Sequence, residues 1–325
     1  MSLPRSLKIE QSFLYRIGTK RKLATLLNLT ISELKLLATD NNYNEWVKKG
    51  KNGTKDRLIE QPNPDLKAAL SRLHLILRDV ETPPWLMSGK RKIKPRDNAE
   101  VHRFNSYMIT IDIKQFYQST KREFVYLAFK KQFGQTDDVA SLLADLVTYK
   151  GHIPTGTATS QLIAFWAYKQ TFERLHKLCL SQKITMTVWV DDITFSSNKP
   201  FPKDWIKNVG NIVNSVSLTI KEEKTKKYSP NEYKVATGSA ISPNGIVLVK
   251  NEKRKEIMDI VNGRTVENLP PKIVKQLFGK LTAQRQNEPD FFSNMYERCR
   301  VRVRELEKRR AMQKRQKNKM NRSPT

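Results

Sequence analysis

The sequence predicts an α+β fold, and two observations support the prediction. Three segments carry the β-branched and aromatic residues typical of strands: 107–113, 185–196 and 235–249. Helical periodicity dominates the chain before these segments and again from about residue 251. Strands mixed with helices in the middle of the chain and helical regions at both ends are typical of an α+β protein.

The N-terminal region, residues 1–55, is expected to be helical and basic. Thr30-Ile31-Ser32-Glu33 has the pattern of a capping box, which marks the start of a helix. An amphipathic helix is expected from Leu66 to Val80, after two prolines. Residues 87–107 are rich in Lys and Arg and are expected to form a loop.

Two adjacent aspartates, Asp191 and Asp192, interrupt the strand pattern of 185–196. The pattern predicts a hairpin whose tight turn presents both carboxylates. Two carboxylates about 4 Å apart repel by roughly 4 kcal/mol at an effective dielectric near 20. A cation, a shared proton or strong hydrogen bonds must offset this repulsion. Taken alone, the pair fits a polar turn as well as it fits a metal site.

The same dipeptide at Asp137-Asp138 is interpreted differently. It follows Thr136 and precedes an apolar helical pattern, so a helix near 136–150 is expected to begin there. Carboxylates in the first turn of a helix are stabilised by the helix dipole. This pair is therefore expected to be structural.

A third carboxylate, Asp112, changes the interpretation of the hairpin aspartates. It stands near the end of the strand pattern of 107–113, where a lone acid would otherwise be a strand-end residue. Three aspartates on two neighbouring strands can hold two Mg²⁺ ions, one at an attacking hydroxyl and one at a triphosphate. Hard oxygen ligands favour magnesium over zinc.

The composition indicates a polyanionic partner. The 325-residue chain has 60 Lys and Arg against 32 acidic residues, a net charge of +28. Such a field attracts nucleic acid, although a membrane-surface protein can be equally basic. No apolar run approaches the 18 residues of a membrane span, and no signal peptide is recognised. With only two cysteines, a cytoplasmic location is expected.

Four segments carry motifs in a specific order. They are Asp112 to Ser119, Ile153 to Ser160, Trp189 to Asp192, and Lys224-Thr225. They look like a first palm motif, a Pro-Gln-Gly segment, a Tyr-Ala-Asp-Asp box and a lysine motif. In this order and spacing, over roughly residues 20–300, the chain resembles bacterial reverse transcriptases of the retron type.

Two further segments resemble signatures within that family. Asn98-Ala99-Glu100-Val101-His102 fits its Asn-Ala-x-x-His pattern, and Ala236-Thr237-Gly238 approximates its Val-Thr-Gly pattern. The resemblance implies that Asn98, His102, Thr237 and Gly238 help to recognise a cognate structured RNA. Without the resemblance, these segments would be read as a capped turn and a strand-end glycine.

The resemblance also implies a role for each catalytic residue. Asp112 and Asp191 are expected to coordinate two Mg²⁺ ions, for which Mn²⁺ is a possible substitute. Asp192 is expected to support them, and the Ile113 carbonyl is expected to be a further ligand. All three aspartates are taken as catalytic.

Five residues are expected to contact the nucleotide: Arg57, Tyr117, Thr155, Gly156 and Lys224. Arg57 would stack on the base and clamp the triphosphate. Tyr117 would crowd a ribose 2′-hydroxyl, unless it is a core aromatic residue. Lys224 would protonate the leaving pyrophosphate, although a solvated lysine face is nearly as good an interpretation.

The chain also departs from the family pattern. Thr155 stands where the family usually has Gln, and Gln161 stands where it usually has Pro. Trp189-Val190 replaces Tyr-Ala and makes the aspartate turn bulkier. These departures leave fidelity and template preference open.

The resemblance implies a right-hand polymerase. Its expected parts are an N-terminal helical segment (1–55), fingers (56–107), a palm (108–250, with a fingers helix near 136–150), a helical thumb (251–304) and a basic tail (305–325). The expected activity is RNA-directed DNA synthesis that copies a dedicated noncoding RNA into single-stranded DNA, in antiphage defence. Expected partners are that RNA, the RNA–DNA hybrid, dNTPs and an effector protein, but no membrane.

Two alternatives stay open at this point. One is a defence-associated reverse transcriptase that makes a repetitive or protein-primed DNA without a branched product. The other is a catalytically silent RNA-binding scaffold, against which the three intact aspartates argue.

Overall fold

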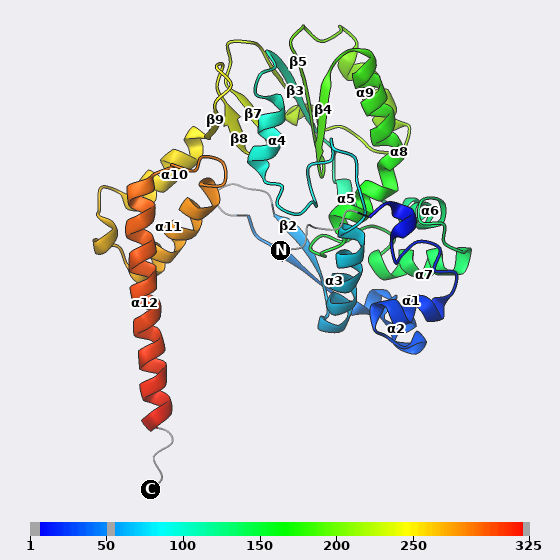
Figure 1. The fold of residues 1–325 in the computed structure, drawn as a ribbon, viewed down its shortest axis with the longest axis horizontal. Helices are drawn as coiled ribbons and strands as arrows, with labels where there is room; N and C mark the ends of the chain where they lie inside the picture. Colours follow the sequence, from blue (N-terminus) through cyan, green and yellow to red (C-terminus); the bar gives the residue numbers. More distant parts are fainter. Residues whose placement is uncertain (1–6, 51–55, 321–325) are drawn as a thin grey trace. The chain divides into compact units, whose positions relative to one another are not determined.

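A computed structural model of the chain describes residues 7–50 and 56–320 (Figure 1). The chain divides into two compact units. The first unit consists of the residues up to Ile93 together with Tyr107–Lys227, and the second consists of Lys94–Ser106 together with the residues from Tyr228 onward.

The N-terminal part of the first unit combines short helices with a β-hairpin. Its elements are η1 (Ile9–Gln11), α1 (Lys20–Leu27), α2 (Ile31–Leu37), η2 (Asp40–Asn42), β1 (Tyr43–Lys48), β2 (Arg57–Pro62) and α3 (Pro64–Arg78). The capping box is confirmed, because the Thr30 amide donates to Glu33 Oε2 at 2.7 Å and the Glu33 amide donates to Thr30 Oγ1 at 3.2 Å.

One strand in this region was not expected from the sequence. Strand β1 lies within the segment 1–55, and it pairs antiparallel with β2 in a register that places Lys48 opposite Arg57. Tyr43, Trp46 and Val47 favour an extended chain once a partner strand is available. Residues 51–55, between the two strands, lie outside the described residues.

A four-stranded sheet forms the centre of the first unit, with the strand order β4-β5-β3-β6. Its strands are β3 (Tyr107–Asp112), β4 (Thr185–Trp189), β5 (Asp192–Ser197) and β6 (Lys226–Tyr228). Helix α8 (Ser160–Ser181) contacts β4 and also α9 (Trp205–Asn214), and Figure 1 shows both helices beside that strand. The expected strand–turn–strand around Asp191-Asp192 is confirmed.

The remaining elements of the first unit are α5 (Phe116–Ser119), α6 (Arg122–Lys131), α7 (Asp137–Val147) and η3 (Glu222–Lys224). Helix α7 begins at Asp137, as predicted. The Asp137 carboxylate lies 2.5 Å from Lys130 Nζ and accepts a hydrogen bond from Tyr126. The pair thus lies in the first turn of α7, as predicted, and the charge of Asp137 is balanced locally.

The second unit contains α4 (Pro95–His102) and a three-stranded antiparallel sheet. The sheet consists of β7 (Lys234–Ala236), β8 (Ser239–Ile241) and β9 (Val247–Val249), so the expected hairpin of 235–249 gains a third strand. The expected loop of 87–107 was wrong for residues 95–102, which are helical. Pro95 occupies the first helical turn, and Asp97 Oδ2 accepts from the Lys94 amide at 2.6 Å, so the helix start is well capped.

The C-terminal helices of the second unit share a separate apolar core. They are α10 (Asn251–Val261), η4 (Val266–Asn268), α11 (Pro271–Gln284) and α12 (Ser293–Met320). Leu277 and Leu281 are fully buried in this core. Helix α12 continues through the expected basic tail to Met320, and residues 321–325 lie outside the described residues. Among the described helices, none combines the length and apolarity required for a membrane span.

Candidate active site

The three predicted catalytic aspartates meet at one end of the central sheet. In the antiparallel register of β3 and β5, Asp112 is the direct partner of Asp192. In the register of β4 and β5, Trp189 is the partner of the same Asp192. Val190 and Asp191 therefore form the two-residue turn of the hairpin. The strand pairing thus brings Asp112 close to Asp191, although Asp112 lies 79 positions earlier in the chain.

The turn that carries Asp191 is held in an unusual conformation. Val190 has φ = 59°, in the left-handed region that β-branched residues disfavour. Two hydrogen bonds hold the turn in place. The Val190 amide donates to Ser88 Oγ at 3.0 Å, and the Ile113 amide donates to the Asp191 carbonyl at 2.9 Å. The second bond fixes the N–H of Ile113 beside Asp191, while the Ile113 carbonyl, the predicted further metal ligand, belongs to the next peptide group.

Two lysines neutralise Asp112. Lys221 Nζ lies 2.5 Å from Asp112 Oδ1, and Lys224 Nζ donates to Asp112 Oδ2 at 2.6 Å. Asp112 is only 6% exposed, so its charge requires such partners. Lys221 was not predicted as a site residue. Only the fold identifies it, because Ile220, the residue before it, forms a β-bridge with Ile113 and so aligns Lys221 with Asp112.

The turn aspartates are less well compensated. Burial raises the pKa of Asp191, and the charge of Asp112 raises it further. Burial likewise raises the pKa of Asp192 to about 6, with added contributions from Asp191 and Asp112. Lys221 and Lys224 act in the opposite direction on both carboxyl groups. The site thus concentrates negative charge that an additional cation would stabilise.

The donor set fits a hard divalent cation in its chemistry. It consists of carboxylate oxygens, which Mg²⁺ prefers, and it includes neither His nor Cys. Within the described parts of the chain, however, no three His, Cys, Asp or Glu side chains converge as a preformed metal shell. In this structure, one of the carboxylates, Asp112, is paired with two lysine ammonium groups instead.

Tyr117 lies on α5, five residues after Asp112. Its side chain is half-buried against the core, and its ring centroid is 6.1 Å from that of Phe116. Burial raises the pKa of Tyr117, and the nearby charge of Asp191 raises it further. The phenol is therefore neutral and within electrostatic reach of the aspartate turn, although it also belongs to the edge of the core.

The other predicted nucleotide contacts lie at the β1–β2 hairpin and at the loop before α8. Arg57 is the first residue of β2 and is exposed. Thr155 is tied to this strand, because its Oγ1 donates to the Leu58 carbonyl at 2.9 Å and its amide donates to Glu60 Oε2 at 2.8 Å. Gly156 is exposed and has φ = 101°, a conformation that favours glycine. These hydrogen bonds hold Thr155 against β2, the strand that begins at Arg57.

The four predicted RNA-recognition residues lie in the second unit. Asn98 Nδ2 donates to Thr237 Oγ1 at 3.3 Å, and Thr237 Oγ1 donates to the Pro95 carbonyl at 3.0 Å. Thr237 and Gly238 both have positive φ, of 46° and 85°, and form the β7–β8 turn. The two motifs, 139 positions apart, therefore join α4 to this turn.

Burial limits what two of these residues do directly. His102 is 0% exposed, and burial lowers its pKa to about 3, so the imidazole is neutral. Asn98 is also buried, and its Oδ1 has no hydrogen-bond partner among the residues that the structure describes. Gly238, in contrast, is exposed. Asn98 is thus suited to shaping the turn, His102 fills the buried C-terminal end of α4, and Gly238 of the turn is accessible.

The fold and the site together define a class of protein. Aspartates from neighbouring antiparallel strands meet at one end of a sheet, lysines lie against them, and the chain is strongly basic. These features are those of a nucleotidyl-transferring polymerase with a mixed α/β fold.

Comparison with known proteins specifies the class further. Residues 47–257, more than half of the chain, match the family described as "Reverse transcriptase (RNA-dependent DNA polymerase)". The chain belongs to this family, whose members generally use divalent metal ions.

Its relatives include enzymes of bacterial retrons. The chain is 29% identical over 225 residues to the retron Se72 reverse transcriptase of Salmonella heidelberg, a match that covers 66% of this chain and 58% of that protein. It is 26% identical over 239 residues to the retron Ec86 reverse transcriptase of Escherichia coli, covering 72% and 73% of the two chains. The match thus spans less than two thirds of the Se72 protein. The predicted resemblance to the retron type is confirmed.

Proposed function

We propose that the protein is an RNA-directed DNA polymerase that copies a dedicated structured noncoding RNA into single-stranded DNA. The observation that carries the proposal is the cross-strand pairing of Asp112 with Asp192, next to the turn that holds Asp191. We also propose a role in antiphage defence, because the relatives of the chain are reverse transcriptases of retrons.

Asp112 and Asp191 are proposed to bind two Mg²⁺ ions, with Asp192 and the Ile113 carbonyl as supporting ligands. When bound, the ions would activate the primer hydroxyl and offset the charge of the triphosphate. In the protein alone, Lys221 and Lys224 balance the negative charge of Asp112 through ion pairs. Hydrogen bonding to Asp112 raises the pKa of Lys224, whose side chain is 55% exposed. A protonated, accessible Lys224 is suited to donate a proton to the leaving pyrophosphate.

The nucleotide would lie between the aspartates and the β1–β2 hairpin. Arg57, with its planar guanidinium, is proposed to contact the base and the triphosphate. Tyr117 is proposed to exclude a 2′-hydroxyl, because its neutral ring is half-buried and lacks freedom to withdraw. Thr155 and Gly156 are proposed to form the adjacent wall, where the exposed backbone of Gly156 lets the ligand approach closely.

A right-hand arrangement is proposed on the same basis. The central sheet of the first unit would be the palm, the β1–β2 hairpin with its helices would be the fingers, and α10 to α12 would be the thumb. In the second unit, the Thr237–Gly238 turn is proposed to contact the RNA, with Asn98 and His102 supporting it from within.

The test is to purify the protein with its nucleic acid and add labelled dNTPs and Mg²⁺. The proposal expects DNA that is complementary to one co-purifying RNA, and it expects this product to disappear in chelator. Sequencing the RNA and the DNA from the same preparation identifies the template. Absence of any dNTP incorporation, or a product unrelated to the bound RNA, would contradict the proposal.

A further inference from the structure

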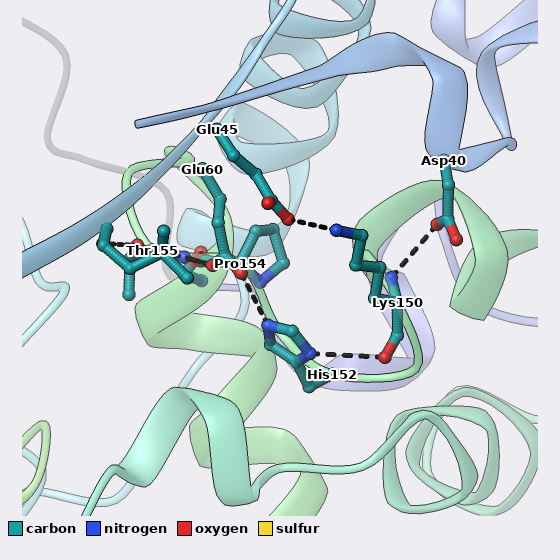
Figure 2. Close-up of polar contacts among 9 residues, drawn as sticks. Asp40, Glu45, Glu60, Lys150, His152, Pro154 and Thr155 are labelled. Carbon is teal, nitrogen blue, oxygen red and sulfur yellow. Dashed lines mark hydrogen bonds and ion pairs between the residues drawn. The ribbon is translucent and has the colours of Figure 1, made fainter. Parts of the chain in front are cut away.

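Strand β2 contains a fully buried acid, Glu60, that the catalytic site does not use. Glu60 is 0% exposed, whereas Arg57 and Leu58 on the same strand are exposed. A buried carboxylate is rare unless it is paired. Its partners come from the loop before α8: Glu60 Oε1 lies 2.7 Å from His152 Nε2, and Glu60 Oε2 accepts from the Thr155 amide at 2.8 Å (Figure 2).

His152 is placed as an imidazolium. Its Nε2 faces Glu60, and its Nδ1 faces the Lys150 carbonyl at 3.3 Å (Figure 2). Both ring nitrogens thus face acceptors, and only the protonated ring donates from both. The hydrogen bond to Glu60 raises the pKa of His152, although burial opposes this. Burial raises the pKa of Glu60, but the bonds from His152 and Thr155 outweigh it and lower that pKa overall.

Further contacts join the hairpin to this loop, and we call the whole set the hairpin seam. Besides the Glu60 contacts, it contains the bond from Thr155 Oγ1 to the Leu58 carbonyl. Lys150 Nζ forms an ion pair with Glu45 at 2.6 Å, and the backbone N–H of Lys150 donates a hydrogen bond to Asp40 Oδ1 at 3.1 Å. The seam also includes the rings of Tyr43 and Tyr149, whose centroids are 4.6 Å apart.

The seam explains the threonine at position 155. Its hydroxyl proton goes to the Leu58 carbonyl, and its amide proton goes to Glu60. Both donors of Thr155 are therefore engaged with β2. In this chain, the residue acts as a tether between the loop and the strand.

We propose that Glu60 and His152 form a positioning pair that fixes the Thr155–Gly156 turn against the strand of Arg57 and thereby sets the affinity for the incoming nucleotide. The proposal rests on the proposed function, because it takes Arg57 and this turn as nucleotide contacts. Arg57 lies three residues before Glu60, about 10 Å along an extended strand. A shift of the turn against β2 would therefore alter the width of the nucleotide site directly.

The test compares the KM for dNTP and kcat of Glu60→Gln and His152→Gln with those of the wild type. Each variant keeps a hydrogen-bonding side chain of similar size but loses the ion pair. The KM is expected to rise about tenfold while kcat changes little, because a charge-assisted hydrogen bond that orders the site is lost. Asp137→Asn is the matched control, since it removes an exposed paired carboxylate on α7 and should leave both constants unchanged.

A pH series gives a second readout. The charged or titratable groups around His152 are Glu45, Glu60, Lys121, Tyr149 and Lys150, and those around Glu60 also include Tyr43. Because the pKa of His152 is raised, its contribution is present below about 6.5 and is lost as the pH rises through the folded-state pKa. The wild-type KM should therefore increase with pH more steeply than the KM of His152→Gln.

NMR titration of the histidines tests the Glu60–His152 pair independently of enzyme activity. The chain has four histidines, and His152 should titrate above the ordinary value in the wild type and lower in Glu60→Gln. An active wild type with an unchanged KM in Glu60→Gln would overturn the positioning pair. A variant whose loss of activity equals its unfolded fraction, measured by thermal melting, would also overturn it. A wild type that incorporates no dNTP would instead overturn the proposed function.

Discussion

Asp112 on β3 and Asp192 on β5 are direct cross-strand partners in the central sheet. Like charges directly opposite one another destabilise an antiparallel pair. The sheet nevertheless places a third carboxylate, Asp191, in the adjacent turn and recruits Lys221 and Lys224 to Asp112. Such a concentration of carboxylates is expected at an active site that binds cations, and the following predictions rest on it.

The first prediction concerns metal-dependent synthesis. Asp191→Asn should lower dNTP incorporation by about a thousandfold, because a ligand change at the metals removes several kcal/mol of transition-state stabilisation. Folding and RNA binding should stay near the wild-type level, as measured by circular dichroism and filter binding. Extension at the wild-type rate by this variant, or by the wild type in chelator, would rule out the assignment.

The second prediction concerns stability without metal. The pKa of Asp192 is raised to about 6, so ionising it disfavours the folded state as the pH rises from about 4 to about 6. Asp192→Asn should therefore be more stable than the wild type at pH 7, by about 1–3 kcal/mol, and should gain nothing below pH 4. Urea unfolding in chelator at both pH values measures the difference.

Mg²⁺ provides the complement to that experiment. It should raise the melting temperature of the wild type by mass action and raise that of Asp192→Asn less. Equal stability of the two proteins at pH 7, with equal responses to Mg²⁺, would show that Asp192 is neither strained electrostatically nor close to the ion.

The third prediction concerns sugar selection. Tyr117 is half-buried near Asp191, and its ring has little freedom to move away from a bulky ribose. Tyr117→Ala should increase rNTP incorporation relative to dNTP by about tenfold, while Tyr117→Phe should keep the wild-type ratio. Single-nucleotide extension kinetics on one template provide both numbers. An unchanged ratio in Tyr117→Ala would assign the ring to the core alone.

The fourth prediction separates RNA docking from chemistry. Thr237→Ala removes the hydroxyl that joins Asn98 to the Pro95 carbonyl, and His102→Ala opens a cavity at the buried C-terminal end of α4. Both variants should lose synthesis on the native noncoding RNA and keep most extension of a supplied primer on a simple template. Melting curves of the same preparations control for unfolding. Equal loss on the two substrates would mean that these residues serve only the fold.

The fifth prediction concerns the basic charge. Binding to arbitrary RNA should weaken steeply with salt, because log affinity falls with log salt by about 0.7–0.9 for each phosphate contact. Removing residues 305–325 should flatten this slope if the C-terminal half of α12 contacts phosphates. The comparison requires titrations of both proteins over the same salt range. Identical slopes would make that part of the helix a bystander.

The sequence predicted the strands at the aspartates because their signals are local. The β-branched run of 185–196 has one interruption, at Asp191-Asp192, and the turn lies there. The sequence places Asp112 and Asp192 near strand ends, whereas the register that pairs them is seen only in the folded sheet. The capping box at Thr30 was predicted for the same reason, since its partners are three residues apart.

Features that depend on distant partners could not be predicted in this way. No local pattern distinguishes Glu60 in the sequence, and only its pairing with His152, 92 positions later, explains its burial. In the sequence, Lys221 cannot be distinguished from the neighbouring lysines. In the fold, its backbone amide donates to the Asp112 carbonyl at 2.8 Å, and its side chain pairs with the Asp112 carboxylate. Helix α4 was hidden because basic residues surround it, although Pro95 and Asp97 mark its start.

The left-handed Val190 has a consequence for how this enzyme can change. A β-branched residue at φ = 59° costs on the order of 1–3 kcal/mol, and glycine would relieve this strain while giving up the contacts of the half-buried Val190 side chain with the core. The same glycine would let the aspartate turn sample many conformations, and Asp191 would spend less time where catalysis requires it. Variants selected for DNA synthesis should therefore not acquire Val190→Gly. Position 190 is thus a point at which relief of backbone strain and activity compete.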